Sequence, residues 1–195
     1  MISRRALLPF GVLALGSVAL GAALYMTFDL PGAGQSGPGA VGGPFNLAGT
    51  DDRKYTDRDL LGRPFLVFFG FTHCPDVCPT TLFEISEVLR RMGPDSKMAA
   101  FYISVDPERD TPGVLKDYLA SFDPRIIGLS GSPEQIAAAM KAYRVYARKV
   151  PLEGGDYTMD HTALVYLMDK RGNFARAFNL QQPPEQAAHE LTLYF

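Results

Sequence analysis

Cys74 and Cys78 are the two cysteines of this 195-residue chain, and a proline follows each of them. A thiolate attacks disulfides and binds soft metals, so two cysteines four positions apart can support either chemistry. A regular helix through both is not expected, because Pro79 would remove the hydrogen bond to the Pro75 carbonyl and clash with it. We expect a tight loop, with Pro79 opening a helix whose N-terminal amides favour thiolates.

Three interpretations of this pair stay open from the residues alone. A structural disulfide would close a very short loop. The loss of chain entropy in the unfolded state would then stabilise the fold by only about 2 kcal/mol. A redox dithiol at a strand-to-helix turn is the arrangement of thiol oxidoreductases. A metal site is the third interpretation: two thiolates suffice for linear copper(I), whereas copper(II) or zinc needs more ligands. The choice depends on a third ligand.

The chain has three histidines that could supply this ligand. His73 adjoins Cys74, so its side chain is expected to point away from the cysteine pair. His189 lies on the polar part of the expected C-terminal helix. His161 stands just before a buried strand, in a segment where a loop can face the cysteine loop across the sheet edge. Taken alone, such a histidine is more often structural than a ligand.

Three separated segments closely resemble signatures of the Sco/SenC family. They are FGFTHCPDVCP at 69–79, SVDPERDTP at 104–112, and DHT at 160–162 with the pair YL at 166–167. The resemblance covers about residues 45–180 in the family's order. It implies a thioredoxin-like fold, a membrane anchor, and a copper site whose ligands match Cys74, Cys78 and His161.

The resemblance also implies a biological task. The family assembles the binuclear copper centre (Cu-A) of cytochrome c oxidase subunit II, as copper donor, thiol reductant or both. This chain would then be a metallochaperone rather than an enzyme, and its cargo would be copper(I) or copper(II). Its partners would be subunit II and an upstream protein that donates copper or reduces the thiols. Two thiolates and a neutral imidazole form a soft set that is formally neutral with copper(II). A structural zinc site would instead be closed by a fourth ligand.

A thiol-disulfide oxidoreductase, acting on protein cysteines or as a peroxidase-like enzyme, is the alternative function. Cys74 and Cys78 would then be the redox-active pair. Thioredoxin-like reductases usually have two residues between the cysteines and a cis-proline opposite them. Here three residues intervene, and 152–182 contains no proline. We favour copper because of the ligand set, although the two roles are compatible, since copper loading needs reduced cysteines.

Acidic residues adjoin two of the signature segments. Asp160 is a candidate to orient His161 through a hydrogen bond, and a solvated or turn-capping role fits its position equally well. The segment 106–110 carries four charges in five residues at the end of an expected strand. This pattern is typical of a turn and helix cap, and only the family resemblance suggests a partner-binding role for it.

The elements that must position these residues alternate between strands and helices. Expected strands cover 65–71, 98–105, 126–129 and 163–168, with a turn at 170–173 leading into 174–178, and 143–150 is a further candidate strand. Expected helices follow Pro79, Pro112, Pro133 and Pro184. This order indicates an α/β sandwich with a central mixed sheet, which the resemblance makes a thioredoxin-like three-layer sandwich. The cysteine loop follows a strand, where sites collect in such sheets.

The N-terminal part indicates export and a single membrane span. After Arg4 and Arg5, residues 6–28 carry no charge and would span about 34 Å as a helix, enough for a ~30 Å hydrocarbon core. The arginines place the N-terminus in the cytoplasm, so the soluble domain is expected on the periplasmic side of the inner membrane. A cleaved signal peptide, with Ala19 and Gly21 near the cleavage site, is the alternative.

The remaining composition describes a tether and one globular domain. Residues 29–44 hold six glycines and three prolines and are expected to form a flexible tether. Residues 45–195 are long enough for one domain, and 47% of the whole chain is apolar. Beyond Arg4 and Arg5 the chain has 17 basic residues against 21 acidic ones, which argues against nucleic-acid binding.

Overall fold

The structure is a computed structural model and describes residues 40–195. The expected membrane helix at 1–28 and the first part of the expected tether, 29–39, lie outside the described residues. Across 40–195, no helix combines the length and the apolar character that crossing a membrane requires.

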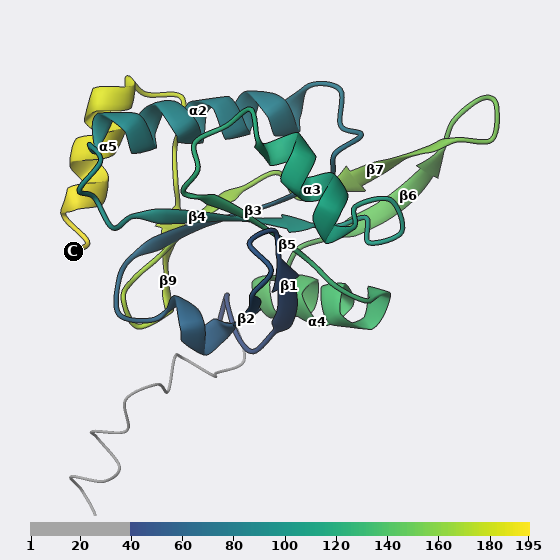
Figure 1. Ribbon diagram of the computed structural model, residues 1–195, viewed down its shortest axis with the longest axis horizontal. Coiled ribbons are helices and arrows are strands. Elements are labelled where there is room, and N and C mark those ends of the chain that lie inside the picture. Colours follow the sequence, from purple (N-terminus) through teal and green to yellow (C-terminus); the bar gives the residue numbers. More distant parts are fainter. Residues whose placement is uncertain (1–39) are drawn as a thin grey trace, which may run out of the picture. The chain divides into compact units, whose positions relative to one another are not determined.

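A seven-stranded mixed sheet forms the centre of the fold (Figure 1). Its strands are β1 (Asn46–Gly49), β2 (Lys54–Thr56), β3 (Phe65–Gly70), β4 (Ala99–Ser104), β5 (Ile126–Ser130), β8 (Val165–Met168) and β9 (Phe174–Ala177). Across the sheet they lie in the order β2-β1-β5-β4-β3-β8-β9. β3, β4 and β5 are parallel, and β8 runs antiparallel to β3. Every residue of β3 and β4 is buried, as expected for apolar runs covered on both faces.

Helices cover both faces of this sheet. They are α2 (Val77–Arg91), α3 (Pro112–Leu119), α4 (Pro133–Tyr143) and α5 (Pro184–Thr192), with a short 3-10 helix, η2 (Asp57–Leu60). Tyr118 of α3 packs on Tyr102 of β4, which in turn packs on Phe68 of β3. Tyr143 of α4 packs on Phe69, whose side chain points to the opposite face from Phe68. The expected α/β sandwich with a central mixed sheet is therefore confirmed (Figure 1).

Local signals predict the starts of α3 and α4 correctly. The Thr111 hydroxyl accepts a hydrogen bond from the Val114 amide, with Pro112 in the first turn. Ser132 and Gln135 form a reciprocal capping box ahead of α4. Both devices satisfy amides that have no partner inside the helix. Short-range hydrogen bonds of this kind can be read from the residues alone.

The expected start of α2 is wrong by two residues. The helix begins at Val77, so Cys78 and Pro79 lie within its first turn and Cys74 lies outside it. Pro79 is tolerated there because amides of the first turn lack helical partners in any case. No regular helix runs through both cysteines, as expected.

A two-stranded hairpin, β6 (Ala147–Pro151) and β7 (Tyr157–His161), projects from the domain (Figure 1). The candidate strand at 143–150 begins only after α4 has ended at Tyr143. The segment with His161 is a strand rather than the expected loop. Its residues are exposed or half-buried, and the segment is short and lacks the continuous apolar run that predicts a buried strand.

The N-terminal end of the described chain contacts the end of α4. The Gly42 amide donates a hydrogen bond to the Ala142 carbonyl at 2.9 Å, and Arg144 donates one to the Ala40 carbonyl at 3.1 Å. These residues belong to the segment assigned to the tether. Its last part therefore packs on the domain.

Candidate metal centre

The topology of the sheet brings the cysteine loop and His161 to the same edge. The cysteine loop leaves the carboxyl end of β3. β8 is antiparallel to β3, with Val165 opposite Phe68, so the chain that enters β8 lies at this edge as well. His161 stands four positions before Val165 and ends β7. Pairing between two strands far apart in sequence thus places the histidine beside the cysteines.

Cys78 and His161 face each other across this edge. The Cys78 sulfur lies 3.8 Å from His161 Nε2, and the histidine ring packs edge-on against Phe71. His161 Nδ1 lies 3.0 Å from the Thr162 carbonyl oxygen. Because a carbonyl only accepts, Nδ1 must carry a proton, so the neutral ring holds its free lone pair on Nε2. This is the tautomer that a metal at Nε2 requires.

Cys74 precedes the N-terminus of α2 and is joined to Cys78 by a hydrogen bond. Its sulfur accepts from the Cys78 amide at 3.4 Å, and its own amide donates to the Phe71 carbonyl. Both cysteines are free thiols. Within 40–195, no three His, Cys, Asp or Glu side chains already stand as a complete metal-binding group. Cys78 and His161 are thus already close enough to share a metal ion, and Cys74 beside them is the candidate for the third ligand.

Burial dominates the chemistry of Cys78. The side chain is fully buried, and burial raises the pKa of its thiol to about 12, while a hydrogen bond from the Phe71 backbone acts in the opposite direction. The expectation that the helix N-terminus favours a thiolate is therefore wrong for Cys78, because desolvation outweighs the helix dipole. A metal must displace a proton from this sulfur to bind it.

Gly70, the last residue of β3, makes room for the sulfur. A Cβ at this position would lie 2.8 Å from the Cys78 sulfur and 2.7 Å from the Tyr102 hydroxyl. Real Cβ atoms do not approach other atoms so closely, so any side chain at Gly70 would displace one of these groups. The glycine is needed here for close approach.

Asp110 anchors the start of the cysteine loop. Its carboxylate is fully buried and accepts hydrogen bonds from the Thr72 hydroxyl at 2.6 Å, the Thr72 amide at 3.1 Å and the Ser104 hydroxyl at 2.7 Å. Because β4 runs parallel to β3, the residues after β4 lie next to the residues after β3. The carboxylate thus ties the two strand ends together.

Asp106 and Arg109 hold the strand that carries His161. The buried Asp106 carboxylate accepts from the Tyr157 hydroxyl at 2.9 Å and pairs with Arg109. Arg109 also donates to the Tyr157 carbonyl at 2.9 Å, and its guanidinium lies 3.7 Å from the centre of the Tyr157 ring. The expected turn at 106–110 is present ahead of α3, yet the segment also links β7 to the sheet. Sequence reasoning missed this role, although the rule that buried charges must be paired could have suggested it.

The other candidate residues lie apart from the pair. His73 is exposed, with Nδ1 3.1 Å from the Thr72 hydroxyl, and His189 is exposed on α5, both as expected. Asp160 is exposed and faces Arg148 at 3.5 Å. The Thr162 carbonyl, not Asp160, orients His161, so the solvated interpretation of Asp160 is the correct one.

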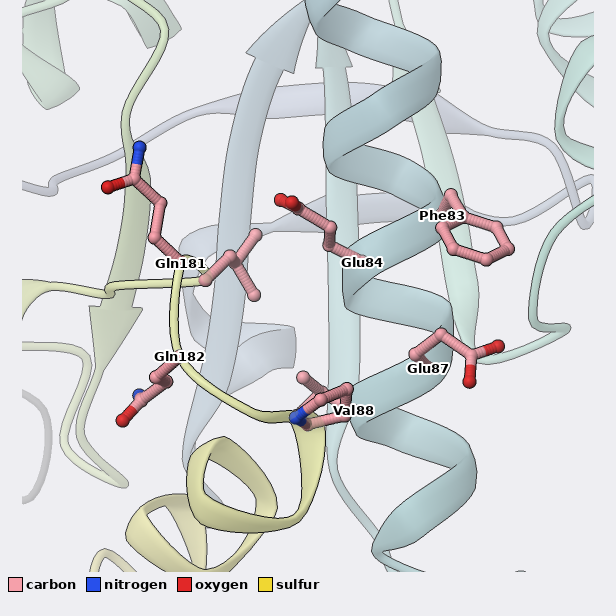
Figure 2. Close-up of a pocket in the computed structure, with 8 residues that line it drawn as sticks. Phe83, Glu84, Glu87, Val88, Gln181 and Gln182 are labelled. Carbon is pink, nitrogen blue, oxygen red and sulfur yellow. The ribbon is translucent and has the colours of Figure 1, made fainter.

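A groove of about 300 Å³ lies between α2 and the segment before α5 (Figure 2). It is lined by Phe83, Glu84, Glu87, Val88, Leu180, Gln181, Gln182 and Pro184. None of the candidate ligands borders it. The groove is therefore separate from the candidate metal centre.

The described domain matches a known protein family. A family model described as SCO1/SenC matches residues 33–195. The chain belongs to the SCO1/SenC family. The family resemblance predicted from three short segments is thus confirmed over the described domain.

Individual members of the family are similar in both sequence and structure. Bradyrhizobium japonicum ScoI, solved with copper bound, is 60% identical, with a TM-score of 0.78 over 80% of this chain and all of that one. The Arabidopsis thaliana mitochondrial protein SCO1 homolog 1 is 40% identical over 145 residues, covering 73% of this chain and 43% of the relative. The chain spans about half the length of the curated relatives it matches.

A more distant solved structure supports the fold. BsSco, a member of the Sco family of cytochrome c oxidase assembly proteins, is 24% identical, with a TM-score of 0.62 over 80% of this chain and 94% of that one. The thioredoxin-like α/β fold with a central mixed sheet that the family resemblance implied agrees with these neighbours.

We expect iodoacetamide to modify Cys74 well before Cys78 in the reduced, metal-free chain. Only the thiolate reacts, and a thiol whose pKa is about 12 stays protonated at pH 8. Cys78 should be modified at least about tenfold more slowly than an ordinary cysteine, and its rate should rise with pH. Mass spectrometry of tryptic peptides measures both rates. In guanidinium chloride the two cysteines should react alike, and equal rates in the folded chain would contradict the prediction.

Proposed function

We propose that this chain is a copper metallochaperone that binds copper through Cys74, Cys78 and His161. The observation that supports this most is that His161 Nε2 faces the Cys78 sulfur at 3.8 Å. Zinc–thiolate and zinc–imidazole bonds are about 2.3 and 2.0 Å and give the length scale for such ligands. At a trigonal angle these bonds separate sulfur and nitrogen by about 3.7 Å. The pair thus has nearly the spacing of two ligands on one metal ion.

The chemical character of the three side chains favours copper. Two thiolates and a neutral imidazole are soft donors, and they form a neutral assembly with copper(II), which lowers the cost of burying the ion. Copper would displace the proton of Cys78 on binding. The family neighbour from Bradyrhizobium japonicum was solved with copper bound. Membership of the same family supports the same cargo here.

We further propose that the copper is destined for the Cu-A centre of cytochrome c oxidase subunit II. BsSco belongs to a family of cytochrome c oxidase assembly proteins, which supports this destination. Cys74 is half-buried whereas Cys78 is fully buried, so an acceptor thiolate would reach the copper from the Cys74 side. In this proposal residues 1–28 anchor the chain in the inner membrane, and the part of 29–44 that precedes the contacts with α4 tethers the domain on its periplasmic side.

Metal binding by the full chain tests the proposed ligands. The reduced chain should bind one copper(II) and show thiolate-to-copper(II) charge-transfer absorption. Cys74→Ser and Cys78→Ser should each lose this absorption, because each removes a ligand, while His189→Ala on the distant α5 should keep it. Absence of the band in the unmodified chain, or its persistence in Cys74→Ser, would contradict the proposed site.

Copper transfer tests the proposed destination. Two equivalents of the copper-loaded chain, one carrying copper(I) and one carrying copper(II), are mixed with the metal-free soluble domain of subunit II. The copper(II) absorption of the chain should be lost while the Cu-A absorption of the mixed-valence pair appears. The matched control is the copper-loaded chain mixed with a subunit II domain whose Cu-A cysteines are serines. A chain that reduces a disulfide of subunit II but never transfers copper would instead support the thiol-disulfide oxidoreductase alternative.

A further inference from the structure

Tyr102 lies beside Cys78 on the face of the sheet covered by α2 and α3. In the register of β3 and β4 it stands opposite Phe68, and Gly70 follows two positions further along β3. Its side chain is fully buried, and its ring packs against Phe68 and Tyr118. The packing around the ring therefore fixes where its hydroxyl oxygen lies, next to Cys78.

The Tyr102 hydroxyl has no nitrogen or oxygen partner in the part of the chain that the structure describes. It shares a small space with the Cys78 sulfur, because a Cβ on Gly70 would lie 2.7 Å from the hydroxyl and 2.8 Å from the sulfur. Burying a hydroxyl without a full partner is costly. A phenylalanine would fill the same volume without that cost, so the hydroxyl calls for an explanation.

A metal-bound sulfur supplies the missing partner. A neutral thiol is a weak acceptor, but a thiolate carries negative charge and accepts much stronger hydrogen bonds. Once a metal replaces the Cys78 proton, the phenol can donate to the sulfur. We propose that Tyr102 is a positioning residue whose hydroxyl donates a hydrogen bond to the metal-bound Cys78 sulfur and so shifts the preference of the site toward copper(I).

The hydrogen bond should favour copper(I) over copper(II) because copper(II) is the stronger electron acceptor. A hydrogen bond withdraws electron density from the thiolate, and copper(II) depends on that density more than copper(I) does. Hydrogen bonds at a cysteine sulfur are an established means of tuning the potential of copper–thiolate and iron–sulfur sites. The inference rests on the proposed function, because it concerns copper held by Cys78.

Tyr102→Phe in the full chain tests this inference, with Tyr143→Phe as the matched control. Tyr143 is also buried but packs on Phe69, on the opposite face of the sheet. In Tyr102→Phe the charge-transfer band should move to longer wavelength, and the ratio of copper(I) to copper(II) affinity should fall about tenfold, which is ~59 mV for a one-electron couple. Tyr143→Phe should change neither quantity.

The outcomes separate this inference from the proposed function. If the unmodified chain shows the charge-transfer band and Tyr102→Phe leaves both band and potential unchanged, the role of Tyr102 is overturned and the proposed function stands. Equal shifts in Tyr102→Phe and Tyr143→Phe would also overturn it, since both would then reflect packing alone. If the unmodified chain shows no band, the proposed copper site is overturned, and the role of Tyr102 with it.

Discussion

His161→Ala should abolish stable copper(II) binding while leaving the domain folded. Two thiolates still satisfy linear copper(I), but copper(II) needs a further donor. We expect the copper(II) affinity to fall on the order of 100-fold or more, since even residues that only orient ligands contribute 10–100-fold. Competitive titration and the charge-transfer spectrum measure the loss. The fold should survive because His161 is only half-buried and ends the projecting strand β7.

His73→Ala is the matched control for this prediction. It removes an imidazole adjacent to Cys74 in the chain, but His73 is exposed and bonded to Thr72, so copper binding should not change. Unchanged copper(II) spectra and affinity in His161→Ala, together with loss of a disulfide-reductase activity in Cys74→Ala, would favour the oxidoreductase alternative.

Asp110→Ala should strongly destabilise the domain. The buried carboxylate accepts three hydrogen bonds, two from Thr72 and one from Ser104, and removing it leaves those donors without their partner. A buried donor left unpaired costs about 1–3 kcal/mol, and the half-buried Thr72 donors cost less because water can reach them, so we expect a loss of about 2–4 kcal/mol in the free energy of unfolding. For a domain of this size Tm should fall by roughly 10 °C. Urea unfolding and calorimetry measure these quantities.

Glu108→Ala is the control from the same segment. Glu108 is exposed and pairs with Lys149 at the surface, where ion pairs contribute little to stability. Its removal should therefore have a far smaller effect than removal of Asp110. Similar Tm values for the two variants would show that the buried carboxylate is not what ties the strand ends together.

Much of the architecture could be predicted because its signals are local. The apolar runs that become β3 and β4, and the caps that start α3 and α4, involve residues close together in the chain. Short polar strands such as β7 could not be predicted in the same way, because their stability comes from partners elsewhere. β7 is held by its pairing with β6 and by the contacts of Tyr157 with Asp106 and Arg109.

The amino-acid sequence by itself determined which donors are present: two thiols in one strand-to-helix loop, and an imidazole ahead of a later strand. These properties depend on residue type and on near neighbours. Only the tertiary structure decided that His161 meets Cys78 across 83 positions, that Cys78 is buried as a thiol, and that Asp106 and Asp110 are enclosed among partners. Strand pairing and desolvation depend on segments distant in the chain, so no local pattern encodes them.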